Sequence, residues 1–305
     1  MPLAIGDKLG PREIWLPLRA GGIGTIEESK MKLLNLLVLI AVSSVLSPSP
    51  VAAQWLDYPT AGIPRTPDGK PNLSAPTPRT ADGKPDLSGL WEMDRKELGG
   101  EPGNNIGLGD ELYSREFGNI GARLQGGLPY QPWAAQLVKT RSTEGNTQDP
   151  LSKGLPVGPV RLHTYAALRK MIQVPGLLVI LNELGASYRQ IFTDGRPLPA
   201  DPSPTWNGYS TGKWDGDVLV VQTNGFRDGL WLDFRGSPLT EAATITERFR
   251  RLNFGQLEIE ITVDDPKAYT KPWTVTLNQV IRLNTDLLDK IMNENEKDLQ
   301  HIVAK

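Results

Sequence analysis

The sequence predicts a mainly β protein in which an antiparallel meander forms a complete or partial up-and-down barrel. Two observations support this fold class. From residue 169 onward, short apolar runs are separated by turn residues at regular intervals, which is typical of a β-meander. The last three of these runs alternate apolar and polar residues with a period of two, as expected for strands with one face in a core and one in water.

Five strands are expected in the first part of the meander, at 170–174, 177–183, 188–193, 212–214 and 218–223. Pro175-Gly176 and Asp215-Gly216 are residue pairs that form tight turns, so each pair is expected to join two antiparallel strands. A proline-rich crossover at 195–210 separates the third strand from the fourth.

The last three strands have the clearest inward faces. Those faces contain Ile245, Glu247, Phe249 and Arg251 in the first strand, Leu257, Ile259, Ile261 and Val263 in the second, and Trp273, Val275, Leu277, Gln279 and Ile281 in the third. Because the other members apart from Arg251 are apolar, Glu247 and Gln279 are expected to be polar residues inside the barrel.

Two helices are expected beside the strands. The first spans 132–140 within a poorly periodic insert, 99–160, where Trp133, Leu137 and Val138 share a face. The second is a C-terminal amphipathic helix, 285–303, capped by Thr285 or Asp286, in which Leu288, Ile291, Asn295, Leu299 and Ile302 follow helical spacing. It is expected to lie on the barrel, so that 89–305 forms a single β domain.

Residues 31–53 have the composition of a secretory signal peptide. Met31 and Lys32 precede a mostly apolar run, and the small residues that end at Ala53 predict cleavage before Gln54. We therefore expect a secreted or periplasmic protein with no membrane span after cleavage, and translation from Met31, so that 1–30 is an upstream extension from a mis-assigned start. The alternative is a cytoplasmic tail before a membrane anchor, although the run is short for a spanning helix.

The segment 54–88 is a proline- and glycine-rich strap with an internal duplication. The two copies read P-R-T-P-D-G-K-P-N-L-S from Pro64 and P-R-T-A-D-G-K-P-D-L-S from Pro78. Each copy contains an Asp-Gly turn followed by Lys-Pro, which predicts an extended segment with tight turns. The carboxylates Asp68, Asp82 and Asp86 do not have the spacing of a calcium loop.

Composition excludes several function classes. The formal net charge is −2, which gives no nucleic-acid footprint. The chain has no cysteine, so disulfides, thiol catalysis and cysteine-ligated metals are excluded. Its two histidines, His163 and His301, are too few for a histidine-based metal site, and no G-x-S-x-G elbow accompanies His163 for a serine triad. We expect no metal and no other cofactor.

Six residues are candidates for ligand binding. Trp206, Tyr209 and Trp231 lie in proline- and glycine-rich loops, where an aromatic side chain has less reason to be buried. Inside the barrel, Glu247 must be paired or have a raised pKa, and Gln279 would be its hydrogen-bonding companion. The structural alternatives are that an arginine neutralises Glu247 or that its strand end turns outward. Arg189 could hold an anionic group, with surface pairing as the default.

Several motifs resemble those of a family of uncharacterised secreted bacterial β-rich proteins. They are D-G-K-P-D-L-S-G-L-W from Asp82, I-F-T-D-G-R-P-L-P from Ile191, G-K-W-D-G-D-V-L-V-V from Gly212, T-E-R-F-R-R from Thr246 and D-D-P-K-A-Y-T-K-P-W-T-V from Asp264. This resemblance implies export but transfers no activity. More distantly, G-L-W at Gly89 is similar to the G-x-W opening of the lipocalins (calycins), which implies that Trp91 packs against an arginine such as Arg282.

Three functions remain open from the sequence. The leading one is binding of a small apolar or aromatic ligand in a barrel cavity, with Trp206, Tyr209 and Trp231 at the mouth and Glu247 and Gln279 inside. The second is a secreted hydrolase acting on a glycan or ester, with Glu247 and Asp233 as paired carboxylates. The third is a structural or interaction module of the envelope. The oligomeric state is not determined by the sequence.

Overall fold

The computed structural model describes residues 58–94, 114–143 and 147–291. The chain divides into two units, 1–53 and 54–305, and every described residue belongs to the second. The boundary falls at the bond predicted for signal cleavage. The signal segment itself, the upstream extension and most of the predicted C-terminal helix lie outside the described residues.

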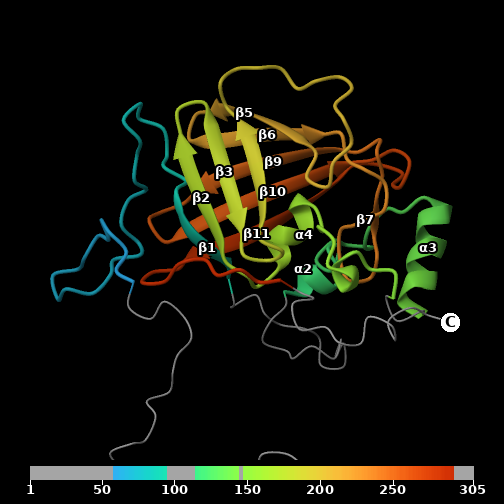
Figure 1. Ribbon diagram of the computed structural model, residues 1–305, viewed down its shortest axis with the longest axis horizontal. Helices are drawn as coiled ribbons and strands as arrows, with labels where there is room; N and C mark the ends of the chain where they lie inside the picture. The colour runs from blue at the N-terminus through green and yellow to red at the C-terminus, as the bar shows by residue number, and fades with distance from the viewer. Residues whose placement is uncertain (1–57, 95–113, 144–146, 292–305) are drawn as a thin grey trace, which may run out of the picture. The chain divides into compact units, whose positions relative to one another are not determined.

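Nine strands form a closed barrel in the order β1-β11-β10-β9-β6-β5-β4-β3-β2, with β2 returning to β1 (Figure 1). All neighbours are antiparallel except β4 and β5, which pair in parallel. The strands are β1 (Gly89–Met93), β2 (Arg169–Val174), β3 (Leu177–Asn182), β4 (Ser187–Phe192), β5 (Tyr209–Asp215), β6 (Val218–Asn224), β9 (Thr244–Arg251), β10 (Gln256–Asp264) and β11 (Trp273–Ile281). The predicted β-rich barrel is confirmed.

The period-two alternation explains which side chains enter the barrel. The inward residues predicted for β9, β10 and β11 are all buried, from Ile245 at 0% to Ile281 at 8% exposure. The outward residues of the same strands are polar except for Val280, and the ion pair between Arg250 and Glu258 joins two of them at 2.6 Å. One buried face and one solvated face therefore fix the register of these strands.

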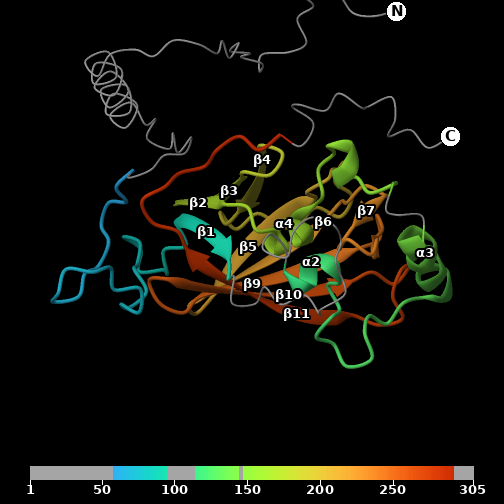
Figure 2. The ribbon, with the colours of Figure 1, turned by 90° about the horizontal axis from the view of Figure 1, so that it is seen from below.

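Short helices lie at one end of the barrel. They are α2 (Arg115–Gly118), α4 (Pro159–Thr164) and the 3-10 turn η2 (Leu151–Lys153). A fourth helix, α3 (Pro132–Thr143), lies between α2 and η2 in the sequence. Figure 2 looks onto this end, with α4 and α2 in front of the strands. Helix α3 confirms the helix expected at 132–140. Helix α4 starts at a proline that follows Gly158, whose φ of +78° is a backbone conformation that favours glycine.

A two-stranded sheet adjoins these helices. It consists of β7 (Leu230–Trp231) and β8 (Pro238–Leu239). Two apolar clusters result: the main one fills the barrel, and a smaller one, which includes Phe117, Leu162 and Leu184, lies beside α2 and α4.

The two strap copies fold alike. Thr66 N–H donates to Lys70 O at 2.9 Å, and Thr80 N–H donates to Lys84 O at 2.9 Å. In both copies the glycine of the Asp-Gly turn has a positive φ, +82° at Gly69 and +79° at Gly83. The sequence duplication is therefore a duplication of structure.

The C-terminal segment differs from its prediction. Residues 285–290 are extended rather than helical, and Lys290 forms an isolated bridge with Leu184. The reason is competition from the β3–β4 turn, because Lys290 N–H donates to Glu183 O at 3.1 Å and Leu288 N–H to the Glu183 carboxylate at 3.3 Å. Asp286, expected as a helix cap, instead pairs with Lys170. The helix prediction is wrong for this segment, and residues 292–303 lie outside the described part.

Within the described ranges, no helix is long and apolar enough to cross a membrane.

Candidate functional site

Four neighbouring strands contribute polar side chains to one group inside the barrel. Arg189 comes from β4, Ser210 from β5, Thr223 from β6 and Glu247 from β9, and these strands are consecutive in the sheet. Arg189, Thr223 and Glu247 are inward because they alternate with buried apolar residues such as Ile191, Val221 and Phe249. All four are at most 3% exposed.

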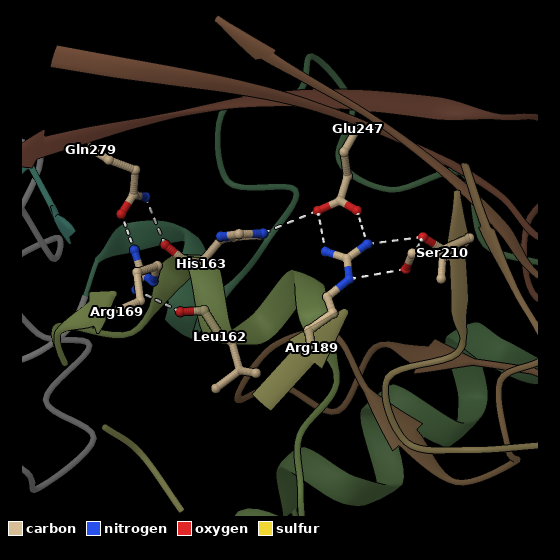
Figure 3. A network of polar contacts seen from close by, with 8 residues as sticks. Leu162, His163, Arg169, Arg189, Ser210, Glu247 and Gln279 are labelled. Atoms are coloured by element: carbon tan, nitrogen blue, oxygen red, sulfur yellow. Dashed lines mark hydrogen bonds and ion pairs between the residues drawn. The ribbon is translucent and has the colours of Figure 1, made fainter. Parts of the chain in front are cut away.

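Arg189 and Glu247 form a bidentate ion pair at the centre of this group (Figure 3). The Nη1 of Arg189 donates to Glu247 Oε1 at 2.9 Å, and its Nη2 donates to Oε2. Arg189 also makes two further hydrogen bonds: Nε donates to Ser210 Oγ at 3.1 Å and Nη2 to Thr223 Oγ1 at 2.9 Å. A buried charge pair with these extra hydrogen bonds meets the condition under which its desolvation is offset.

His163 joins the pair from α4. Its Nε2 lies 3.0 Å from Glu247 Oε1, and its ring packs edge-on against Phe249 at a centroid distance of 5.8 Å. Burial lowers the pKa of His163, and the hydrogen bond and charge of Glu247 only partly oppose this shift. The neutral ring therefore donates its Nε2 proton to the carboxylate.

A second polar group holds the backbone of α4. Gln279 of β11 donates to His163 O at 3.0 Å and accepts a hydrogen bond from Arg169 of β2. Arg169 also donates to Leu162 O at 2.7 Å and to Tyr165 O at 3.0 Å. The guanidinium thus caps the C-terminal end of the helix, where the carbonyl groups and the helix dipole favour a cation.

The electrostatics of the network fix Glu247 as an anion. Burial alone would raise its pKa, but the charge of Arg189 and the hydrogen bonds from His163 and Arg189 outweigh burial and lower the pKa to about 2. Such a carboxylate does not exchange protons near neutral pH, and it is 0% exposed. The group is therefore a structural counter-ion rather than a general acid or base.

An apolar pocket of about 280 Å³ lies on the other side of α4. Its walls come from the segment 151–157, from α4, from the β3–β4 turn and from the C-terminal segment. Most lining side chains are apolar: Leu151, Leu155, Pro156, Val157, Leu162, Leu184 and Ile291. The others are Gly154, Gly185 and Ser187, so no lining residue among those described ionises. Leu155 and Ile291 are 42% and 47% exposed, which marks the side that opens to solvent.

No family model and no curated protein sequence matches this chain.

Three of the predicted site residues come together. Glu247, Gln279 and Arg189 all point into the barrel and belong to the network around α4. The expected surface pairing of Arg189 is wrong, because its side chain is 3% exposed and neutralises Glu247. The alternation of Arg189 with Ile191 on one strand was the signal that could have placed it inside. His163 and Arg169 were missed, since their partners are 84 and 110 residues away in sequence.

The three aromatic candidates have separate surroundings. Trp231 is 2% exposed, with the Arg141 guanidinium 4.4 Å from its ring centroid. Tyr209 stacks on Phe192 at 5.3 Å on the outside of the barrel. Trp206 is half-buried and carries Arg227 over its ring at 4.4 Å. None of the three lines the pocket, and their contact with a ligand stays a prediction.

The paired-carboxylate hypothesis receives no geometric support. Asp233 is 0% exposed and accepts hydrogen bonds from Ile120 N–H at 3.0 Å and from the Ser237 hydroxyl at 2.6 Å. Burial raises its pKa, opposed by these hydrogen bonds. Glu247 has a different set of partners, so the two carboxylates belong to separate buried networks.

The arginine over Trp91 is not the expected one. The Arg251 guanidinium lies 4.9 Å from the Trp91 ring centroid, whereas Arg282 pairs with Glu92 at 3.2 Å. Arg251 is on the inward face of β9 and therefore reaches the tryptophan from inside the barrel.

The described residues contain no cluster of three or more His, Asp or Glu side chains that could hold a metal ion.

Proposed function

We propose that this protein binds a small, uncharged, largely apolar molecule in the pocket beside α4. The observation that carries the proposal is the lining of the pocket, which is apolar apart from the Ser187 hydroxyl and two glycine backbones. Ligand sites are typically concave, mostly apolar and furnished with few polar groups. A charged ligand would lose its hydration here without gaining a counter-ion.

The volume limits the size of the ligand. At about 280 Å³ the pocket has nearly twice the volume of the engineered apolar cavity of about 150 Å³ that binds benzene. Molecules of one or two rings, or aliphatic chains of similar bulk, are therefore the class that fits. The Ser187 hydroxyl, which donates to Leu184 O at 3.2 Å, is the available polar contact.

The proposal includes an extracytoplasmic setting. It is supported by the signal-like segment 31–53, by the unit boundary between Ala53 and Gln54, and by the motif resemblance to secreted bacterial proteins. In that setting the protein would bind a neutral compound in the cell envelope.

The test is a titration with naphthalene, 2-naphthol and 2-naphthoate, followed by calorimetry and thermal unfolding. The two neutral probes should bind and raise the melting temperature, and the carboxylate should bind at least tenfold more weakly. Leu155→Trp should fill the pocket and abolish binding. Leu252→Trp is the matched control, because Leu252 is 46% exposed and does not line the pocket. Equal binding by both variants would refute the site.

A second candidate function, an interaction module of the envelope, is favoured by one observation. Ile172 and Val174 on the outside of β2 are 39% and 45% exposed, and the adjoining Gln173 contacts the strap at Leu87. Exposed apolar residues beside a proline-rich strap are typical of a contact surface. A photo-reactive residue at position 174 should then cross-link an envelope protein in cells, whereas one at Thr262, on a polar outer face, should not.

A further inference from the structure

The pocket wall is part of a helix that the barrel holds from inside. All six residues of α4 are buried, although the helix has less than two turns. Such a short helix is not stable by itself, so its position depends on tertiary contacts. Three contacts come from the barrel interior: Arg169 to Leu162 O, Gln279 to His163 O, and Glu247 to the His163 ring. Two others come from the insert, where Asp149 pairs with Arg161 at 2.6 Å and the Ser114 hydroxyl donates to Thr164 O at 3.0 Å.

Leu162 contacts both the pocket and the polar network inside the barrel. Leu162 presents its side chain to the pocket, while its carbonyl oxygen accepts the 2.7 Å hydrogen bond from Arg169. The next carbonyl, that of His163, accepts from Gln279. A change in these hydrogen bonds therefore acts on the backbone of the residue that forms the pocket wall.

Gln279 connects these contacts to one another. Its amide oxygen accepts from Arg169 Nη1 and its amide nitrogen donates to His163 O, so a single side chain links the buried guanidinium to the backbone of α4. Since Gln279 is 1% exposed, no solvent replaces it when it is removed.

We infer that Gln279 and Arg169 are positioning residues of the pocket: they hold α4 so that Leu162 forms its wall. This inference rests on the proposed function for its effect on ligand affinity, but not for its effect on α4. Neither residue touches the pocket, and both act through the helix backbone.

The test compares Gln279→Leu with Thr223→Val. Thr223 belongs to the other half of the buried network, bonds Arg189 and Ser210, and makes no described contact with α4. Both substitutions remove one buried polar group, so both should lower the melting temperature. Only Gln279→Leu should weaken 2-naphthol binding, by at least tenfold, and speed amide exchange across residues 160–168.

Gln279→Glu separates the two contacts. A carboxylate at this position still accepts from Arg169 but no longer donates to His163 O. Affinity between the wild-type and Gln279→Leu values would support the inference, and so would exchange of α4 that is only partly accelerated. This variant also serves if Gln279→Leu fails to fold.

Two results would overturn the inference. One is a loss of affinity that follows the melting temperature equally in the Gln279 and Thr223 variants. The other is wild-type exchange of residues 160–168 in both Gln279 variants. If the wild-type protein binds none of the probes, the proposed function fails, and amide exchange alone decides whether Gln279 positions α4.

Discussion

At the scale of single residues, the interior of this barrel is organised by one ion pair and one histidine. Alternation along the strands predicts that Glu247 and Gln279 face inward, because period-two patterning depends on local sequence alone. It does not identify their partners. Arg189, Arg169 and His163 reach these side chains from elements that are distant in sequence, and only the closed barrel brings them together.

Removing the Glu247 charge should destabilise the protein strongly. In Glu247→Gln the Arg189 guanidinium stays buried without a counter-ion, which we expect to lower the free energy of unfolding by about 3–5 kcal/mol. The measurement is urea unfolding of the variant beside Arg189→Met and the double variant. The double variant should recover part of the loss, since it removes both charges. A double variant with the summed loss of the two single ones would contradict the pairing.

His163 should make stability sensitive to mild acid. Its folded-state pKa is lowered below the ordinary 6.5, mainly by burial. The unfolded chain therefore binds a proton first as pH falls below that value, and stability declines. The lowered pKa of Glu247 adds a further loss below about 4.5. We expect His163→Gln, which keeps a donor for Glu247, to lose less stability between pH 7 and pH 5 than the wild type, measured by urea unfolding. An identical loss in both proteins would exclude His163 as the source.

At the scale of elements, the strap provides an internal comparison. Its two copies share their turn hydrogen bonds, but they contact the barrel differently: the first copy accepts a backbone hydrogen bond at Leu73 O from Gly255 N–H at 2.8 Å, whereas the second makes side-chain contacts. Arg79 pairs with Asp217 of the β5–β6 turn at 2.6 Å, and the Gln173 amide accepts from Leu87 N–H at 2.9 Å. The leucine at the equivalent place in the first copy, Leu73, is 45% exposed, whereas Leu87 is 0% exposed. The two leucines of nearly identical sequences thus have different surroundings because of where each copy lies on the barrel.

The two leucines should therefore respond differently to truncation. Leu87→Ala leaves a cavity in the core and should lower the free energy of unfolding by about 2–5 kcal/mol. Leu73→Ala changes an exposed side chain in the same local sequence and should stay within about 0.5 kcal/mol of the wild type. Chemical denaturation of both variants is the measurement. Similar losses would mean that the strap itself, rather than its docking, determines the effect.

Two segments, α4 and 285–290, have structures that the hydrophobic period of the sequence does not predict. Helix α4 has no apolar stripe because all its residues are buried, so the 3.6-residue period that reveals α-helices is absent. The segment 285–290 begins a run with that period but is not helical, since its backbone and Asp286 bond Glu183 and Lys170 instead. Both outcomes depend on tertiary contacts that override local preference.

At the scale of the whole molecule, the polar network crosses the shortest strand pairing of the barrel, the seam between β4 and β5. β4 and β5 pair in parallel over only two residue pairs, Ile191 with Ser210 and Phe192 with Thr211. By contrast, β10 pairs with β11 over eight. Arg189 bridges the short seam with side-chain bonds from β4 to Ser210 of β5, Thr223 of β6 and Glu247 of β9. Closure at this point therefore depends on side chains as much as on the backbone ladder.

Loss of one hydroxyl at this seam should open it locally. Ser210→Ala removes the bond between Arg189 and β5, so we expect faster amide exchange at Ile191, Phe192 and Thr211 than in the wild type. Ser210→Ala also removes the bond between the Ser210 and Thr223 hydroxyls. Thr262→Ala is the control, because it removes a cross-strand hydroxyl bond, to Thr274 at 2.8 Å, across the eight-pair ladder of β10 and β11. Exchange in those strands should not change. If both variants behave alike, the backbone ladder alone closes the barrel; if only Ser210→Ala opens its seam, Arg189 holds the parallel strands together.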